Sequence, residues 1–202
     1  MRKIQILFIF IICLQSCNRN SEYEAEELKA LEEVSSDFLF KKDFNIRMNP
    51  PELIVKGKIT ETIADSSAIR VFISDALLPI NQEKEDNLWM FKDNNFSKTD
   101  SIMFYQISNS KKFKELGYRE FDKQKINLKK PYIQSEYSEI KKYADKPYKI
   151  LKFSRICFDI NKENGIVVIE MLEGSEYGTM NGYNGAILIK KKNNRWHYVQ
   201  KK

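Results

Sequence analysis

The pattern of apolar and polar positions predicts a helix near the start of the folded part of the chain. Its apolar residues recur at spacings of three and four and form one helical stripe, made by Leu28, Leu31, Val34, Phe38 and Leu39. Ser21 and Glu24 have the three-residue separation of a capping box, and further acids occupy the first turn, where the helix dipole stabilises negative charge. We therefore expect a helix from Ser21 to about Lys42.

The last third of the chain has the pattern of an antiparallel meander. Four strand-like segments follow one another, at residues 150–160, 165–172, 186–192 and 195–200. Asn193 and Asn194 separate the last two, and asparagine tolerates the positive φ that a two-residue hairpin turn requires. The two-residue period places Trp196 and Tyr198 on one face of the sheet. Ile166–Ile169 is apolar without alternation, which predicts a strand covered on both faces.

The middle of the chain carries weaker signals. Strands are expected at residues 53–55, 69–73 and 102–107, a polar loop at 93–100, and short helices at 111–116 and 135–143. Together these elements predict an α+β fold in which an N-terminal helix packs on an antiparallel sheet with a C-terminal β-meander. The length is that of a single domain, which we place at residues 21–202.

The N-terminus has the pattern of an export signal. Met1-Arg2-Lys3 is basic, residues 4–13 are nearly all apolar, and Leu14-Gln15-Ser16-Cys17 follows. A basic start, a short apolar run and small residues before a cut are the parts of a secretory signal peptide. The run also resembles the lipobox of bacterial lipoproteins, in which signal peptidase would remove residues 1–16 and Cys17 would carry the lipid. Residues 17–20 would then form a short lipidated tether.

Two other interpretations of this segment remain open. A plain secretory signal would need a cleavage site of the A-x-A kind, which residues 14–20 do not contain. An uncleaved anchor helix would need about 20 apolar residues, roughly twice the length of this run. The lipoprotein interpretation predicts a lasting hold on the membrane, because several acyl chains bind a bilayer far more firmly than one. It places the protein in the bacterial cell envelope, at the outer membrane, on its periplasmic or surface face.

The cysteine content excludes an intramolecular disulfide in the processed chain. Loss of residues 1–16 from the 202-residue chain leaves 186 residues; it removes Cys13, and Cys17 is acylated. Cys157 is then left without a partner, so the core alone must hold the fold. Its position in the apolar segment 150–160 predicts a small buried thiol, with a nucleophile as the alternative.

Charge is unevenly distributed along the chain. Residues 21–37 contain seven acids against Lys29 alone, whereas residues 111–152, here called the basic middle, contain thirteen Lys or Arg against six acids. The basic middle is able to meet an anionic surface, and a solvated face is the simpler alternative. Aromatic residues interleave with these cations, as in a stacking platform for single strands. Exported lipoproteins rarely meet nucleic acid, however, so we expect no nucleic-acid partner.

The segment Glu173–Gly185 holds four of the seven glycines and is expected to be a loop between two strands. Its glycines lack the spacing of phosphate-binding motifs. Tyr177, Asn181 and Tyr183 offer flat surface and hydrogen-bonding groups, which makes this a possible binding loop. The alternative is a long hairpin connection in which glycines supply unusual backbone angles.

The sequence predicts no catalytic residues, no metal site and no cofactor. His197 is the only histidine, which excludes a multi-histidine metal site, and we expect it at a surface or strand edge. The spacing of acids singles out no catalytic pair. Trp196, directly before His197, is expected to anchor the core rather than to contact a ligand.

The C-terminal quarter combines Phe153-Ser-Arg-Ile-Cys-Phe158, a polar turn, the Gly-rich segment and the closing run Lys191-Lys-Asn-Asn-Arg-Trp-His197. This combination resembles the end of small uncharacterised lipoproteins common in Bacteroidota. In that group the Gly-rich loop often contains a cysteine. None is present in this loop, so a disulfide or metal role there does not carry over, and the group implies no activity.

These observations favour a membrane-anchored lipoprotein with a non-enzymatic binding or envelope-structural role. Its expected partners are the membrane, through the N-terminal lipid, and an envelope protein or an anionic surface. One alternative is a carboxylate-based envelope hydrolase, which a deep pocket with convergent acids would favour. Another is an inhibitor or immunity-like protein that binds its partner through the basic middle, which a flat basic face would favour.

Overall fold

The computed structural model describes residues 21–35, 37–39, 69–92, 96–143, 146–174 and 180–199. The signal peptide, Cys17, the strand expected at 53–55 and the expected helix end near Lys42 lie outside the described residues.

The predicted N-terminal helix is confirmed. It begins at residue 21, runs to 35 and includes residues 37–39. Its apolar stripe faces inward, because Leu31, Val34, Phe38 and Leu39 are buried and Leu28 packs against the same core. The stripe is the feature that docks this helix on the sheet.

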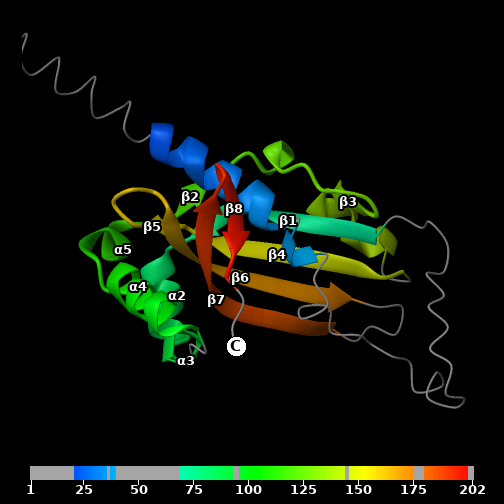
Figure 1. The fold of residues 1–202 in the computed structure, drawn as a ribbon. Coiled ribbons are helices and arrows are strands. Elements are labelled where there is room, and N and C mark those ends of the chain that lie inside the picture. Colours follow the sequence, from blue (N-terminus) through cyan, green and yellow to red (C-terminus); the bar gives the residue numbers. More distant parts are fainter. Residues whose placement is uncertain are drawn as a thin grey trace, which may run out of the picture.

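Eight strands form one sheet (Figure 1). They are β1 (Ile69–Leu78), β2 (Arg119–Glu120), β3 (Tyr132–Ser135), β4 (Tyr148–Ser154), β5 (Cys157–Phe158), β6 (Asn164–Gly174), β7 (Met180–Lys192) and β8 (Arg195–Tyr198). The order is β2-β1-β4-β6-β7-β8, with β3 paired to β1 and β5 to β6. β4, β6, β7 and β8 form the predicted antiparallel meander, whereas β1 runs parallel to β3 and β4. The α+β class is confirmed, and the complete sheet is mixed.

The last hairpin turns as the sequence predicted. Asn193 and Asn194 have φ values of 50° and 60°, the left-handed conformation that a two-residue turn needs. Lys192 pairs with Arg195 across the turn. The turn therefore sets the register that carries Trp196 onto the core face.

A helical layer connects β1 to the rest of the sheet. It consists of α2 (Ile80–Asp86), α3 (Trp89–Lys92), α4 (Lys98–Ser108) and α5 (Lys111–Glu115), and it is followed by the 3₁₀ turns η2 (Lys123–Lys125) and η3 (Tyr137–Tyr143). The short helices expected near 111–116 and 135–143 are thus present, the second as a 3₁₀ turn.

The strand expected at residues 102–107 is wrong, and so is the last part of the expected polar loop. Both lie in α4, which starts at Lys98. Ser97 accepts a hydrogen bond from the backbone N–H of Asp100 and so caps the helix. Phe104 and Ile107 are buried beneath it, at helical spacing. The run of apolar and aromatic residues is compatible with the helical and with the strand period. The Ser97 cap favours the helix.

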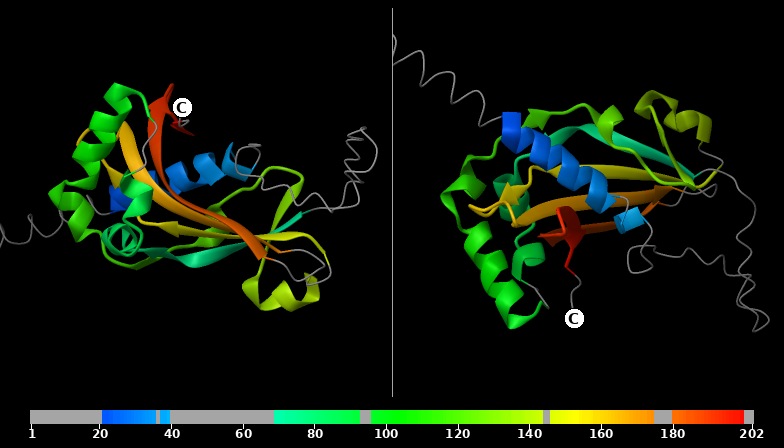
Figure 2. Two further views of the ribbon diagram at one scale, coloured as in Figure 1. Left: turned by 90° about the horizontal axis from the view of Figure 1, so that it is seen from below. Right: turned by 45° about the horizontal axis from the view of Figure 1, so that its top comes forward.

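Two cores lie on opposite faces of the sheet. The N-terminal helix covers one face and the helical layer covers the other, as Figure 2 shows. In β6, Val167 and Ile169 belong to the core under the N-terminal helix, whereas Ile166 and Val168 belong to the core under the helical layer. The prediction of a strand covered on both faces is confirmed.

Candidate functional site

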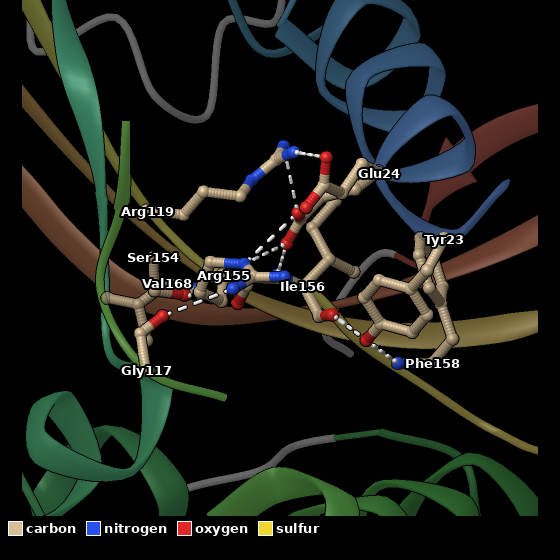
Figure 3. A network of polar contacts seen from close by, with 10 residues as sticks. Tyr23, Glu24, Gly117, Arg119, Ser154, Arg155, Ile156, Phe158 and Val168 are labelled. Carbon is tan, nitrogen blue, oxygen red and sulfur yellow. Dashed lines mark hydrogen bonds and ion pairs between the residues drawn. The ribbon is translucent and has the colours of Figure 1, made fainter. Parts of the chain in front are cut away.

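A network of charged side chains joins the N-terminal helix to the sheet (Figure 3). At its centre is Glu27, whose side chain is fully buried. The carboxylate accepts hydrogen bonds from Arg155 Nε at 2.9 and 3.1 Å and from the backbone N–H of Ile156 at 2.7 Å. Arg119 Nη2 lies 3.1 Å from Glu27 Oε2. A buried carboxylate is stable only with such partners, because removing a charge from water costs several kcal/mol.

The two arginines are held by further groups in the same network. Arg155 Nη1 donates to the carbonyl of Gly117 at 3.1 Å, and Arg119 Nη1 lies 3.0 Å from Glu24 Oε2. The network therefore ties the N-terminal helix to β2 and to the segment after β4. Apart from Arg119 Nε, which is buried without a hydrogen-bond partner in the described part of the chain, the donors and acceptors named here bind one another. This pairing suits a structural lock better than a site for substrate.

Tyr23 and Cys157, at the edge of this network, hold their protons at neutral pH. Burial raises the pKa of Tyr23 far above its ordinary value, and the nearby Cys157 and Glu27 raise it further. Burial also raises the pKa of Cys157 to about 11, against the opposing effect of a hydrogen bond with Ser110. The thiol is buried, as predicted. Because the thiolate is the nucleophilic form, this environment disfavours a nucleophilic role for Cys157.

The acids of the N-terminal helix bind the last hairpin. Glu26 accepts a hydrogen bond from Trp196 Nε1 at 2.7 Å and forms an ion pair with Lys191 Nζ at 2.6 Å. Glu33 accepts from the backbone N–H of Trp196 at 2.7 Å. Burial alone would raise the pKa of Glu26, but the bonds from Lys191 and Trp196 hold that pKa below its ordinary value. The acidic segment noticed in the sequence is thus largely a docking face for the sheet.

Part of the possible binding loop is a strand in the structure. Its last part, from Met180, is the start of β7, and Asn181 pairs with Glu173 of β6. Tyr177 lies outside the described residues. Tyr183 packs against the core, with its ring centroid 5.4 Å from that of Phe38. Of the three side chains, that of Tyr183 alone is described, and it packs against the core instead of standing free as a binding group.

The glycines of this segment make room for aromatic rings. A Cβ on Gly185 would lie 2.3 Å from the hydroxyl oxygen of Tyr183, and one on Gly174 would lie 2.2 Å from the Tyr148 ring. Neither glycine has a left-handed φ. The expectation that glycines here supply unusual backbone angles is wrong for Gly174 and Gly185, because close packing is what excludes a side chain.

His197 lies at the sheet edge, as expected. It belongs to β8, the last strand in the order, and its side chain is 45% exposed. Its Nδ1 lies 3.5 Å from Asp37 Oδ2. Trp196, its neighbour, is 1% exposed and stacks on Phe158 at a centroid distance of 5.0 Å, so it anchors the core.

Many cations of the basic middle are paired within the molecule. The ion pairs are Lys111–Glu115, Arg119–Glu24, Arg119–Glu27, Lys123–Glu136, Lys125–Asp122, Lys142–Glu139, Lys149–Glu173 and Lys152–Glu170. Lys112 lies over the Tyr23 ring at 4.8 Å. Much of the positive charge is therefore balanced locally, which weakens the field that this segment presents to a partner.

Large apolar side chains remain exposed on the helical layer. Leu88, between α2 and α3, and Trp89, the first residue of α3, are 45% and 58% exposed, and Ile102 and Tyr105 of α4 are 51% and 70% exposed. α3 and α4 pack together through the buried rings of Phe91 and Phe104, whose centroids are 5.8 Å apart. We call these four side chains the apolar surface. Sequence reasoning missed it because α4 was expected to be a strand; its signal was Ile102 and Tyr105 at helical spacing.

An open hollow of about 410 Å³ is lined by Asp75, Glu120, Phe121 and Asp122. It lies where β1 shifts its register against β4, between Ile73 and Leu77. Register shifts of this kind often re-aim side chains beside functional sites. The hollow places exposed carboxylates from β1, β2 and the following segment around one space.

Across the described ranges, no group of three His, Cys, Asp or Glu side chains is placed to hold a metal ion. In the same part of the chain, no helix is long and apolar enough to cross a bilayer. Comparison of the chain with models of protein families, with curated proteins and with solved structures found no match.

Proposed function

We propose that this chain is a lipid-anchored protein of the bacterial cell envelope that binds a partner protein without catalysing a reaction. The lipobox-like run ending at Cys17 supports the anchor. The apolar surface carries the binding proposal, because Leu88, Trp89, Ile102 and Tyr105 are exposed on adjoining parts of one layer. Tryptophan and tyrosine are enriched where proteins bind one another, and exposed apolar groups in the same layer favour contact.

The chemistry of the polar groups also supports binding over catalysis. Glu27, Arg119 and Arg155 are engaged with one another, and the Cys157 thiol is buried and protonated at neutral pH. A general acid, base or nucleophile must reach a substrate in its active protonation state. These groups are engaged in holding the fold together, whereas the four side chains of the apolar surface are each 45–70% exposed and so are open to a partner.

Site-specific cross-linking tests the binding proposal. A benzophenone-bearing phenylalanine placed at Tyr105 in the full-length chain should give one dominant adduct in cells, and Trp89→Ala should weaken it several-fold. The matched control places the same group at Tyr137, a half-exposed tyrosine on η3. Equal adducts at both positions, or none at position 105, would refute a specific interface on the helical layer.

The anchor is tested separately at Cys17. We expect wild-type cells to incorporate a fatty-acid analogue into the protein and Cys17→Ser cells to leave it unlabelled, because the cysteine at the lipobox cut is the acylated residue. Cys157→Ser provides a matched control and should retain the label. Equal labelling of wild type and Cys17→Ser would refute the lipoprotein assignment.

The acidic hollow favours a second candidate, a carboxylate-based envelope hydrolase. Asp75 and Glu120 line the same space, and paired carboxylates can act as acid and base in hydrolysis. The full-length protein would then release soluble fragments from isolated cell-envelope polymers, and Asp75→Asn and Glu120→Gln would each abolish that release. An activity that persists in both variants would exclude the hollow as its site.

A further inference from the structure

Ile160 is the most exposed large apolar residue in the described structure, with a relative exposure of 101%. It lies in the turn between β5 and β6. The turn is well ordered by its own contacts: Asp159 accepts hydrogen bonds from the backbone N–H of Glu163 at 2.9 Å and from Asn164 Nδ2 at 2.6 Å. Lys162 adopts a φ of 53° to close it. The fold therefore exposes an isoleucine to water at the tip of a hydrogen-bonded turn.

This turn lies at the end of the molecule where the N-terminal helix begins. Phe158, two residues before Ile160, packs edge-on against Tyr23 with a centroid distance of 5.4 Å. The Tyr23 hydroxyl also donates to the carbonyl of Ile156. Figures 1 and 2 show the start of the helix, the β5–β6 turn and α5 at the same end. Ile160 is thus close to the first residues of the folded chain.

The length of the tether limits how far this end can lie from a lipid on Cys17. Asn18, Arg19 and Asn20 separate Cys17 from Ser21. Even fully extended, four Cα-to-Cα steps span only about 14 Å. A bilayer that holds the acyl chains would therefore lie against the end that carries Ile160.

We infer that the β5–β6 turn is a membrane contact in which Ile160 enters the boundary between headgroups and acyl chains. This inference rests on the proposed acylation of Cys17. Burial in the bilayer removes the isoleucine side chain from water, the environment that disfavours it. Lysines and acids both lie in the turn, in α5 and in the first helical turn: the lysines are Lys111, Lys112, Lys114 and Lys162, and the acids are Glu22, Glu24, Glu115, Asp159 and Glu163. Lysine stems can lie along the interface with their ammonium groups at lipid phosphates.

A dye at position 160 tests the contact. Ile160→Cys in the full-length acylated protein is labelled with an environment-sensitive fluorophore and reconstituted into vesicles of phosphatidylethanolamine and phosphatidylglycerol. Cys17 is blocked by lipid, and Cys157 is buried with a raised pKa, so neither competes for the label. We expect emission at shorter wavelength and several-fold stronger quenching by nitroxide lipids than at a control position.

Ile133→Cys is the matched control. Ile133 is a partly exposed isoleucine on β3, and β3 lies at the far end of the N-terminal helix, where Tyr132 donates to the carbonyl of Leu39. Equal quenching at 160 and 133, on a protein whose Cys17 carries lipid, would overturn the membrane contact and leave the lipoprotein proposal standing. A protein without lipid on Cys17 would overturn both.

Discussion

Glu27 and Arg155 are separated by 128 residues, yet their side chains are joined by two hydrogen bonds inside the protein. Arg155 Nε lies 2.9 Å from one oxygen of the carboxylate and 3.1 Å from the other. Glu27 stands on the N-terminal helix and Arg155 directly follows β4. This pair fixes how the helix lies on the sheet, because an apolar stripe alone permits sliding and rotation.

Glu27→Gln should reduce the free energy of unfolding by about 3–5 kcal/mol, since removing one partner leaves a buried arginine charge without compensation. Urea denaturation at neutral pH measures the loss. Glu24→Gln is the matched control: its side chain is 47% exposed and it pairs with Arg119, so its loss should cost less than about 1 kcal/mol. Similar costs for the two variants would show that burial does not set the value of the pair.

Trp196→Ala should be destabilising by about 3–5 kcal/mol, because the ring fills the core and its N–H bonds to Glu26. The sequence placed Tyr183 in a possible binding loop, where truncation of the side chain would cost little stability. Its packing against Phe38 changes this expectation to about 1–3 kcal/mol. Chemical denaturation of both variants decides. An unchanged Trp196→Ala would place the indole at the surface and contradict the structure.

Acid should weaken the attachment of the last hairpin through Glu26. Bonds from Lys191 and Trp196 lower the pKa of Glu26 in the folded protein, so the folded state binds its proton less tightly than the unfolded chain. The stabilisation is therefore complete above the ordinary value of 4.5 and is lost as the pH falls below it, toward the folded-state pKa. Denaturation curves recorded at several pH values across this range should show that the free energy of unfolding of Glu26→Gln falls less steeply with decreasing pH than that of the wild type. Parallel curves for wild type and variant would contradict the proposed linkage.

Raising the pH should destabilise the protein through Cys157, whereas lowering the pH does so through Glu26. The pKa of the thiol is raised from 9.0 to about 11, so the folded state keeps its proton longer than the unfolded chain. The contribution of the protonated thiol to the free energy of unfolding is complete below pH 9. It is lost as the pH rises to 11, a change of about 2–3 kcal/mol. Cys157→Ala should remove this part of the alkaline decline, and the difference from wild type isolates it from other groups. Reductant should leave the unfolding midpoint of the wild type unchanged, since Cys157 has no disulfide.

The features that the sequence predicted correctly are those encoded over a few residues. The stripe from Leu28 to Leu39 and the Asn193-Asn194 turn each depend on neighbours in the chain, so their periods and backbone preferences are visible directly. The prediction of a strand at Ile102–Ile107 was wrong because runs of apolar and aromatic residues fit both helix and strand. There the Ser97 cap carried the missing information.

The Glu27–Arg155 pair and the acidic hollow were missed because they arise from distant segments. The parallel pairing of β1 with β4 joins segments separated by the whole helical layer, and no local pattern encodes that register. The Glu27–Arg155 pair and the hollow beside Asp75 depend on it. Gly174 and Gly185 were expected to supply unusual backbone angles. The rings that they accommodate, Tyr148 and Tyr183, could be assigned only once β6 and its neighbours were in register.

The bonds between Trp196 and the N-terminal helix also impose an order in time. The helix is synthesised before β8, and Glu26 and Glu33 bind the indole and the amide of Trp196, which lies 170 and 163 positions later. As the chain is synthesised, the helix can already dock on the sheet through Glu27 and Arg155 before β8 exists. A chain stopped before Arg195 lacks the last set of contacts, the bonds from Trp196 to Glu26 and Glu33.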